Sequence, residues 1–315
     1  MGWLQLITSR TIIVFVVQVA IWYLVMGPAK SEAAEEVVSL NQPFKFSAFG
    51  TAGLLYDDSP FHMQRDFGQP DTFRGSKYSL LADSLVGAQV DYNITGRFDA
   101  TVQMVAKKRA QQTIEESLEW TFIRWRPTDE LAVRAGRLGL DLYMLSDYRS
   151  VGFAYLWQRP VVEFYGPLMF QNFDGADVAY SYKLGEGTLQ GKLFGGVADR
   201  SLELVQGGGI NNLEMSSIFG GKVSYEDEQL RLSLGYGRAT IGGNLKNISE
   251  LMTPLRNSSP LWPEAGTIAN TIASKNRVIQ FFSAGAAYEI NNWLLQGEAG
   301  YLASNWPVLP DIMSG

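Results

Sequence analysis

Apolar and polar residues alternate along most of the chain after residue 44. In one segment apolar side chains occupy every second position: Phe98, Ala100, Val102, Met104 and Ala106. The positions between them are mostly polar or charged: Arg97, Asp99, Thr101, Gln103 and Lys107. A period of two places the two sets on opposite faces of a β-strand. Such segments run for about 10–13 residues, which exceeds the usual globular strand and matches a tilted strand that crosses a bilayer.

The alternation predicts about eleven strands. They cover residues 45–56, 78–92, 97–107, 117–126, 131–140, 173–183, 188–197, 217–225, 230–241, 277–288 and 293–303.

The connections between these strands are short and long in turn. The short ones are 93–96, 127–130, 184–187, 226–228 and 290–292, and the long ones are 57–77, 108–115, 141–172, 198–216 and 242–276. Tight periplasmic turns opposite longer external loops are typical of outer-membrane barrels. We therefore expect an all-β fold, an antiparallel transmembrane β-barrel.

Aromatic residues collect beside the short turns, on the apolar faces of the strands. They are Tyr92, Phe98, Trp125, Tyr182, Tyr225, Tyr288 and Trp293. Their place at one end of one face is typical of the aromatic girdle at a membrane interface. The alternative is that aromatic residues simply favour strands.

The first residues have the organisation of an export signal. Arg10 precedes an apolar run from Ile12 to Met26, and small residues follow near Ala33. This pattern predicts a signal peptide over residues 1–33, a periplasmic segment over 34–44 and the barrel domain over 45–315. The alternative is a membrane anchor helix, but Gln18 interrupts the run and its length falls short of the roughly 20 residues that a span needs.

Composition narrows the class of protein further. The 315 residues carry 26 Lys+Arg against 32 Asp+Glu, a net charge of −6, which argues against nucleic acid as a partner. The mean hydropathy of −0.04 is too low for a multi-span helical membrane protein. One histidine, His62, and no cysteine exclude thiol catalysis, disulfides and zinc sites built from several Cys or His ligands. We expect no metal and no cofactor; the acidic residues near His62 favour a solvated loop over a calcium site.

Several short stretches resemble a Gram-negative family of porin-like outer-membrane proteins. They are EWTFIRWRPTD at 119–129, RAGRL at 134–138, SDY at 146–148 and GFAY at 152–155. The likeness extends from about Phe46 to Tyr301. It implies an outer-membrane barrel of roughly 16 strands, often trimeric. The strands expected beyond Gly315 would then be missing, so we expect an open or incomplete barrel with a gap between strands 45–56 and 293–303.

The connection at 141–172 is rich in aromatic and apolar residues, unlike a solvated loop. In general porins the third external loop folds into the lumen, and the resemblance implies the same here. The residues that would reach the constriction are Asp141, Asp147, Arg149, Arg159 and Glu163. The alternative is a loop that packs over the mouth of the barrel or against a neighbouring subunit.

Strand parity directs a set of basic residues toward the lumen. They are Arg97, Lys107, Arg124, Arg134, Lys192, Lys222 and Arg231. An Arg or Lys that faces lipid at mid-depth costs about 2–4 kcal/mol, so the lumen is the favoured side. These charges either create a transverse field opposite acidic loop residues or merely keep the pore wet. Arg137 has the opposite parity to Arg134, which indicates a bulge or a subunit interface.

These patterns predict passive diffusion of small hydrophilic solutes or ions across the outer membrane, with no reaction catalysed. The expected partners are membrane lipid, lipopolysaccharide, the solutes themselves and two further copies in a homotrimer. One alternative is a plugged structural or adhesive barrel. A second is an outer-membrane lipase that uses His62, although no spacing of nucleophile and base supports it.

Overall fold

The alternating segments form antiparallel strands in the computed structural model of the chain. The structure describes residues 14–19, 43–58, 69–70, 72–73, 76–154, 160–166, 170–202, 211–242, 246–272, 277–305 and 312–314. The strands are β1 (Val14–Val19), β2 (Phe44–Tyr56), β3 (Tyr78–Ser79), β4 (Leu85–Thr95), β5 (Phe98–Lys107), β6 (Leu118–Trp125), β7 (Leu131–Gly139), β8 (Asn172–Leu184), β9 (Gly187–Leu202), β10 (Asn211–Glu226), β11 (Leu230–Gly242), β12 (Arg277–Ile290), β13 (Trp293–Ser304) and β14 (Ile312–Ser314). The helices are α1 (Ile114–Ser117), α2 (Val162–Tyr165), α3 (Lys246–Asn257) and α4 (Glu264–Ile272), with 3₁₀ turns at Ser146–Tyr148 and Gly152–Ala154.

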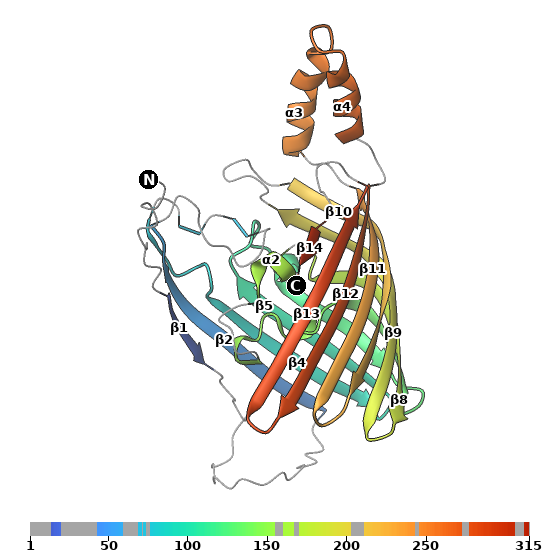
Figure 1. Cartoon of the computed structure of the whole chain (residues 1–315). Helices are drawn as coiled ribbons and strands as arrows, with labels where there is room; N and C mark the ends of the chain where they lie inside the picture. Colours follow the sequence, from blue (N-terminus) through green and yellow to red (C-terminus); the bar gives the residue numbers. More distant parts are fainter. Residues whose placement is uncertain are drawn as a thin grey trace, which may run out of the picture.

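In the described part of the chain, all fourteen strands belong to one curved sheet (Figure 1). From β4 to β13 each strand pairs with the next one in sequence, as in a meander of hairpins. The predicted antiparallel all-β fold is therefore confirmed, and each of the eleven predicted strands overlaps a strand of the sheet. The tight turns lie at one end of the sheet and the long loops at the other (Figure 1).

The sheet is open, as predicted: within the described residues no ladder joins its first and last strands. The two strands that border the predicted gap, β2 and β13, nevertheless have further ladder partners. Strand β1 pairs with Gly50–Leu55 of β2, and β14 pairs with Gly300–Leu302 of β13. Strand β1 lies inside the segment predicted to be a signal peptide; cleavage there stays a prediction and would remove this partner of β2.

The two faces of the sheet differ as the sequence predicts. On β9, Leu193 is 71% exposed on the outer face, whereas the next residue, Phe194, is 6% exposed on the inner face. On β11 the same contrast separates Leu234, at 64%, from Ser233, at 7%. Large apolar side chains exposed over a whole face are typical of a surface covered by lipid or by another protein.

The predicted strand 78–92 is wrong in its first half. Residues 80–84 form a turn between β3 and β4, and Leu80 and Leu81 are both exposed where alternation would have buried one. The turn brings Asp83 against β2, where a Cβ on Gly53 would lie 2.7 Å from the Asp83 Cβ. Ser84 also bonds to Gly53, accepting from its N–H at 3.0 Å.

Other differences concern the long loops. Strands β9 and β10 each have 16 residues, so they extend into the connection that the sequence assigned to 198–216. The connection at 242–276 contains α3 and α4, which pack together as a hairpin that projects from the long-loop end (Figure 1). No helix among the described residues is long and apolar enough to cross a membrane.

Candidate functional site

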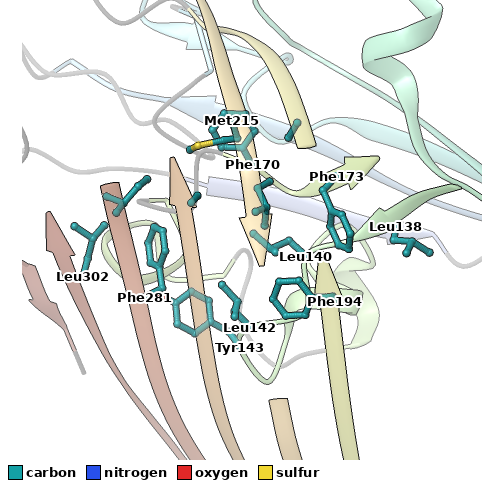
Figure 2. Close-up of a cluster of buried hydrophobic side chains, with 14 of the residues drawn as sticks. Leu138, Leu140, Leu142, Tyr143, Phe170, Phe173, Phe194, Met215, Phe281 and Leu302 are labelled. Carbon is teal, nitrogen blue, oxygen red and sulfur yellow. The ribbon is translucent and has the colours of Figure 1, made fainter. Parts of the chain in front are cut away.

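The connection between β7 and β8 lies against the inner face of the sheet. Its residues Leu140, Leu142, Tyr143, Phe164, Tyr165 and Phe170 belong to one buried cluster with side chains from β6 to β13. Figure 2 shows Leu142 and Tyr143 between Phe281 of β12 and Phe194 of β9 in this cluster. Burial of these side chains explains why the segment is so rich in apolar residues, since a solvated loop has no use for them.

Glycines on the inner face of β11 to β13 make room for this loop. A Cβ on Gly235 would lie 2.6 Å from the carbonyl oxygen of Leu142, and one on Gly285 would lie 2.5 Å from the sulfur of Met144. Real Cβ atoms do not approach other heavy atoms so closely, so any other residue at Gly235 would push the loop backbone away from the wall.

Polar contacts fix the same part of the loop. Ser283 Oγ of β12 donates to the carbonyl of Leu142 at 2.6 Å. Glu298 of β13 accepts from the N–H of Met144 at 2.6 Å and from the hydroxyl of Tyr165. Burial raises the pKa of Tyr143 to about 12, so its phenol is neutral throughout the physiological range.

Asp141 is the strongest ionic anchor of the loop. Its two carboxylate oxygens each accept from a lysine at 2.5 Å, Lys192 of β9 and Lys222 of β10. Burial by itself raises the pKa of Asp141, but the two ammonium groups outweigh burial and the pKa is lowered. The carboxylate is therefore charged at neutral pH and ties the loop to two adjacent strands.

The loop then crosses the interior to the opposite part of the sheet. Val151 packs on the buried cluster of Phe49, Leu85 and Val105, which come from β2, β4 and β5. The loop thus contacts both halves of the inner face, from β11 at Leu142 to β2 at Val151. This geometry differs from a loop that lies only over the mouth of the barrel.

Most basic residues of the inner wall are paired with carboxylates on neighbouring strands. Arg134 bonds Asp177 with N···O distances of 2.5–3.1 Å, and Arg124 bonds Asp99 at 3.0 Å. Lys107 lies 3.7 Å from Glu119, which also pairs with Arg109 at 2.6 Å. Of the acidic loop residues, Asp141 touches two of these basic residues directly, Lys192 and Lys222, and a field across the pore stays a prediction.

Two of the predicted wall residues lie at the tight-turn rim instead. Arg97 is in the β4–β5 turn, where its Nη1 donates to the carbonyl of Pro127 in the next turn at 2.8 Å. Arg231 pairs with Glu226 at 2.7 Å across the β10–β11 hairpin, and its side chain is half exposed. Strand parity states on which face of the sheet a side chain lies, but not how far along the barrel axis it lies.

Arg137 points to the outer face, where its Nε and Nη2 donate to Asp174 at 2.8 Å each. Strand β7 pairs with β6 and β8 without a register shift, so the predicted bulge is wrong.

The inner faces of β2 and β4 to β7, together with loop residues between 147 and 154, line a cavity of about 800 Å³ that is open to solvent. A ladder of polar groups runs along its wall. Thr101 donates to Asp91 at 2.7 Å, the Gln89 amide donates to the same carboxylate, and Gln103 donates to Gln89 at 2.9 Å. A second cavity of about 480 Å³ lies beside β10 to β13, and Tyr148 and Ala154 line both.

The remaining loop residues are placed in part. Asp147 lines the larger cavity, and the guanidinium of Arg149 lies 5.8 Å from the ring centre of Tyr165. Arg159 and the side chain of Glu163 lie outside the described residues, as do His62, Asp66 and Asp71. The acidic partners Asp99, Asp177 and Glu298 were not predicted as site residues, although inward parity applies to them as it does to the basic residues.

The predicted aromatic girdle lies on the outer face beside the tight turns. Trp293 is 73% exposed, Tyr182 is 55% exposed, and the rings of Phe98 and Trp125 stack across β5 and β6 with centres 6.0 Å apart.

No protein-family model and no curated protein matches the chain. Solved structures do match. A loop L8 deletion mutant of OmpT, an outer membrane protein of Vibrio cholerae, is 10% identical, with a TM-score of 0.35 over 86% of this chain and 85% of that one. In-vitro folded OmpT of Vibrio cholerae, in its trimer form, is 9% identical, with a TM-score of 0.34 over 86% of this chain and 81% of that one.

These matches require one correction to the sequence-based expectations. The chain resembles outer membrane proteins named OmpT, and nothing in that likeness confines it to passive channels. The same fold can carry unrelated functions. The statement that the chain catalyses no reaction is therefore withdrawn.

Proposed function

We propose that the chain forms an outer-membrane channel through which small hydrophilic solutes diffuse passively. The observation that carries the proposal is the contrast between the two faces of β2 and β4 to β6. Their outer face exposes apolar side chains such as Val90 and Val102, while their inner face lines a cavity with Asp91, Thr101 and Gln103. A polar inner wall behind an apolar outer one is the arrangement of a water-filled barrel in a membrane.

The loop between β7 and β8 would set the width of this channel. It is held to β9 and β10 by Asp141 and touches β2, β4 and β5 through Val151, so it narrows the space inside the sheet. Among the described residues, the polar cavity beside β2 and β4 to β7 is the larger of two spaces that the loop leaves open.

Liposome swelling tests the proposal. Vesicles that contain the refolded chain should swell in isotonic solutions of small sugars at rates that fall as solute size rises. Vesicles with the chain that swell no faster than empty ones would contradict passive diffusion.

The second candidate is a plugged structural or adhesive barrel. The crossing of the interior by the apolar loop favours it, because a loop packed on both halves of the sheet could also seal the lumen. The same swelling assay separates the two functions, since a plugged barrel folds and inserts but admits no solute.

We also propose a homo-oligomer, on the evidence of the ion pair between Arg137 and Asp174 on the outer face of β7 and β8. Charged side chains on a lipid-facing surface are costly, and a subunit contact would cover them. Chemical cross-linking in membranes should give a trimer; monomer alone would exclude it.

A further inference from the structure

The larger cavity has a cluster of guanidinium groups at the end of the sheet that carries the tight turns. Arg124 and Arg126 of β6 and the following turn both pair with one carboxylate, that of Asp99 on β5, at 3.0 and 2.9 Å. Asp99 is buried, whereas the two arginine side chains are 38% and 39% exposed. Two positive charges thus share one negative charge at the wall of a water-accessible space.

The pairing with Asp99 uses only part of the guanidinium of Arg124, a residue that lines the cavity. The bonds from Arg124 to Asp99 use only its Nε, at 3.0 and 3.1 Å. Within the described residues no hydrogen bond uses its Nη atoms. A planar guanidinium with open Nη groups suits a carboxylate, which it can bind through two parallel hydrogen bonds.

This excess is local to the two arginines. Elsewhere in the lining, Lys45 is positive, Asp91 and Asp147 are negative, and Arg134 is paired with Asp177. Asp91 already accepts hydrogen bonds from Gln89 and Thr101. The smaller cavity across the loop differs, because it is lined by Glu226, Asp227, Glu228 and Glu289 with Arg231 as its basic member.

Apolar and aromatic groups lie in the same cavity as the two arginines. The lining includes Trp120 and Phe122 of β6, Phe49 of β2, and Tyr148 and Val151 of the loop. Such surfaces favour a solute with a planar or aliphatic body, since burial of apolar area is favourable and aromatic rings stack on one another.

We propose that the cavity beside Arg124 and Arg126 is a binding site for small organic carboxylates with an apolar or aromatic body. The carboxylate binds the two guanidinium groups, and the body lies against Trp120 and Phe122. The inference rests on the proposed function in one respect: if the chain is a channel, the site names the class of solute that enters it through the larger cavity.

Equilibrium binding to the folded full-length chain in detergent micelles tests the site without any need for conductance. Calorimetry compares benzoate with benzamide, its neutral analogue of the same shape, and with acetate, which lacks the ring. We expect benzoate to bind on the order of tenfold more tightly than benzamide, as hydrogen bonds between charged groups are worth that factor or more. Acetate should also bind more weakly than benzoate.

Variants locate the site. The double variant Arg124→Gln with Arg126→Gln should lose on the order of tenfold in benzoate affinity. The control, Arg256→Gln on α3, removes one positive charge from the projecting hairpin and should leave the affinity unchanged. If the double variant does not fold, Asp99→Asn serves instead, and it should tighten benzoate binding because the shared carboxylate charge is gone.

Several results would overturn the site. They are equal binding of benzoate and benzamide, no saturable binding of benzoate, and an unchanged affinity in the double variant. Equal affinities for acetate and benzoate would show that the apolar wall contributes nothing to binding. Benzoate binding without solute diffusion would refute the channel and keep the site, whereas diffusion without benzoate preference would refute the site alone.

Discussion

Asp141 accepts a hydrogen bond from Lys222 at 2.5 Å, and this contact joins the β7–β8 loop to the inner face of β10. Lys222 also donates to the carbonyl of Tyr143 at 3.1 Å, so one ammonium group binds both a side chain and the backbone of the loop. The loop position therefore depends on a few charged contacts as well as on the apolar cluster around it.

Removal of the Asp141 charge should loosen the loop. Asp141→Asn leaves two mostly buried lysines without this counter-charge, and breaking a fully buried pair in this way costs about 3–5 kcal/mol. We expect the free energy of unfolding in detergent to fall by an amount of that order. Asp129→Asn, which removes the same charge from an exposed turn, is the control and should stay within about 0.5 kcal/mol of the parent. Equal stabilities for both variants would show that Asp141 does not anchor the loop.

The ion pairs of Asp141 with Lys192 and Lys222 predict that stability depends on pH with a definite sign. The pKa of Asp141 is lowered in the folded chain, so its contribution to stability is present above the unfolded-state pKa of about 3.9 and is lost as the pH falls through the folded-state pKa. The difference in melting temperature between the parent chain and Asp141→Asn should therefore be constant from neutral pH to about 5 and shrink below about 4. A difference that shrinks already between pH 7 and 6 would contradict the assignment.

A bulky side chain on β11 tests the contact between the sheet and the β7–β8 loop by steric crowding. A side chain at Gly235 would strike the carbonyl oxygen of Leu142, so Gly235→Val should displace the loop from β11 and cost about 1–3 kcal/mol. Gly297 on the outer face of β13 has nothing within 4 Å of its Cβ position, and Gly297→Val is the matched control. Unfolding in urea measures both, and equal midpoints would mean that the loop does not rest on Gly235.

Adjacent residues of β4 can test which face of the sheet meets lipid and which meets the lumen. Val90 is 37% exposed on the outer face, and Gln89 lies beside Asp91 on the inner face. Val90→Arg places a charge in lipid and should cost about 2–4 kcal/mol, whereas Gln89→Arg places it in the lumen near a carboxylate. The shift in electrophoretic mobility on heating measures the yield of folding into lipid vesicles. This yield should drop for Val90→Arg alone. A drop for Gln89→Arg alone would reverse the assignment of the faces.

The sequence was sufficient to predict the strands because alternation and turn length are local signals. Alternation correctly predicted the inward parity of Arg124 and Arg134. The neighbouring positions of β6 follow the same parity, since Phe122 is 8% exposed and Ile123 is 53% exposed. The turn at residues 80–84 escaped prediction because Leu80, Ala82 and Ser84 continue the alternation, and only the approach of Asp83 to Gly53 ends the strand.

The site was less accessible to sequence reasoning. Parity states which way a side chain points but not what it meets, and the partners of Asp141 come from strands 51 and 81 residues away in sequence. The helices α3 and α4 were also missed, since Pro254 lies inside α3 and lowers its helical propensity. In contrast, the aromatic composition of the β7–β8 loop was a valid sign that it is buried.

Cysteine accessibility during conductance recording tests the central claim, a water-filled path along the inner face of β2 and β4 to β6. The chain has no cysteine, so a single introduced thiol is labelled specifically. Ser47 of β2 lines the larger cavity, and Ala48 beside it faces outward. In planar bilayers the account predicts steady single-channel steps that fall when Ser47→Cys is modified by a charged methanethiosulfonate and that are unchanged for Ala48→Cys. An absence of steps, or steps that stay the same after Ser47→Cys is fully modified, would contradict it.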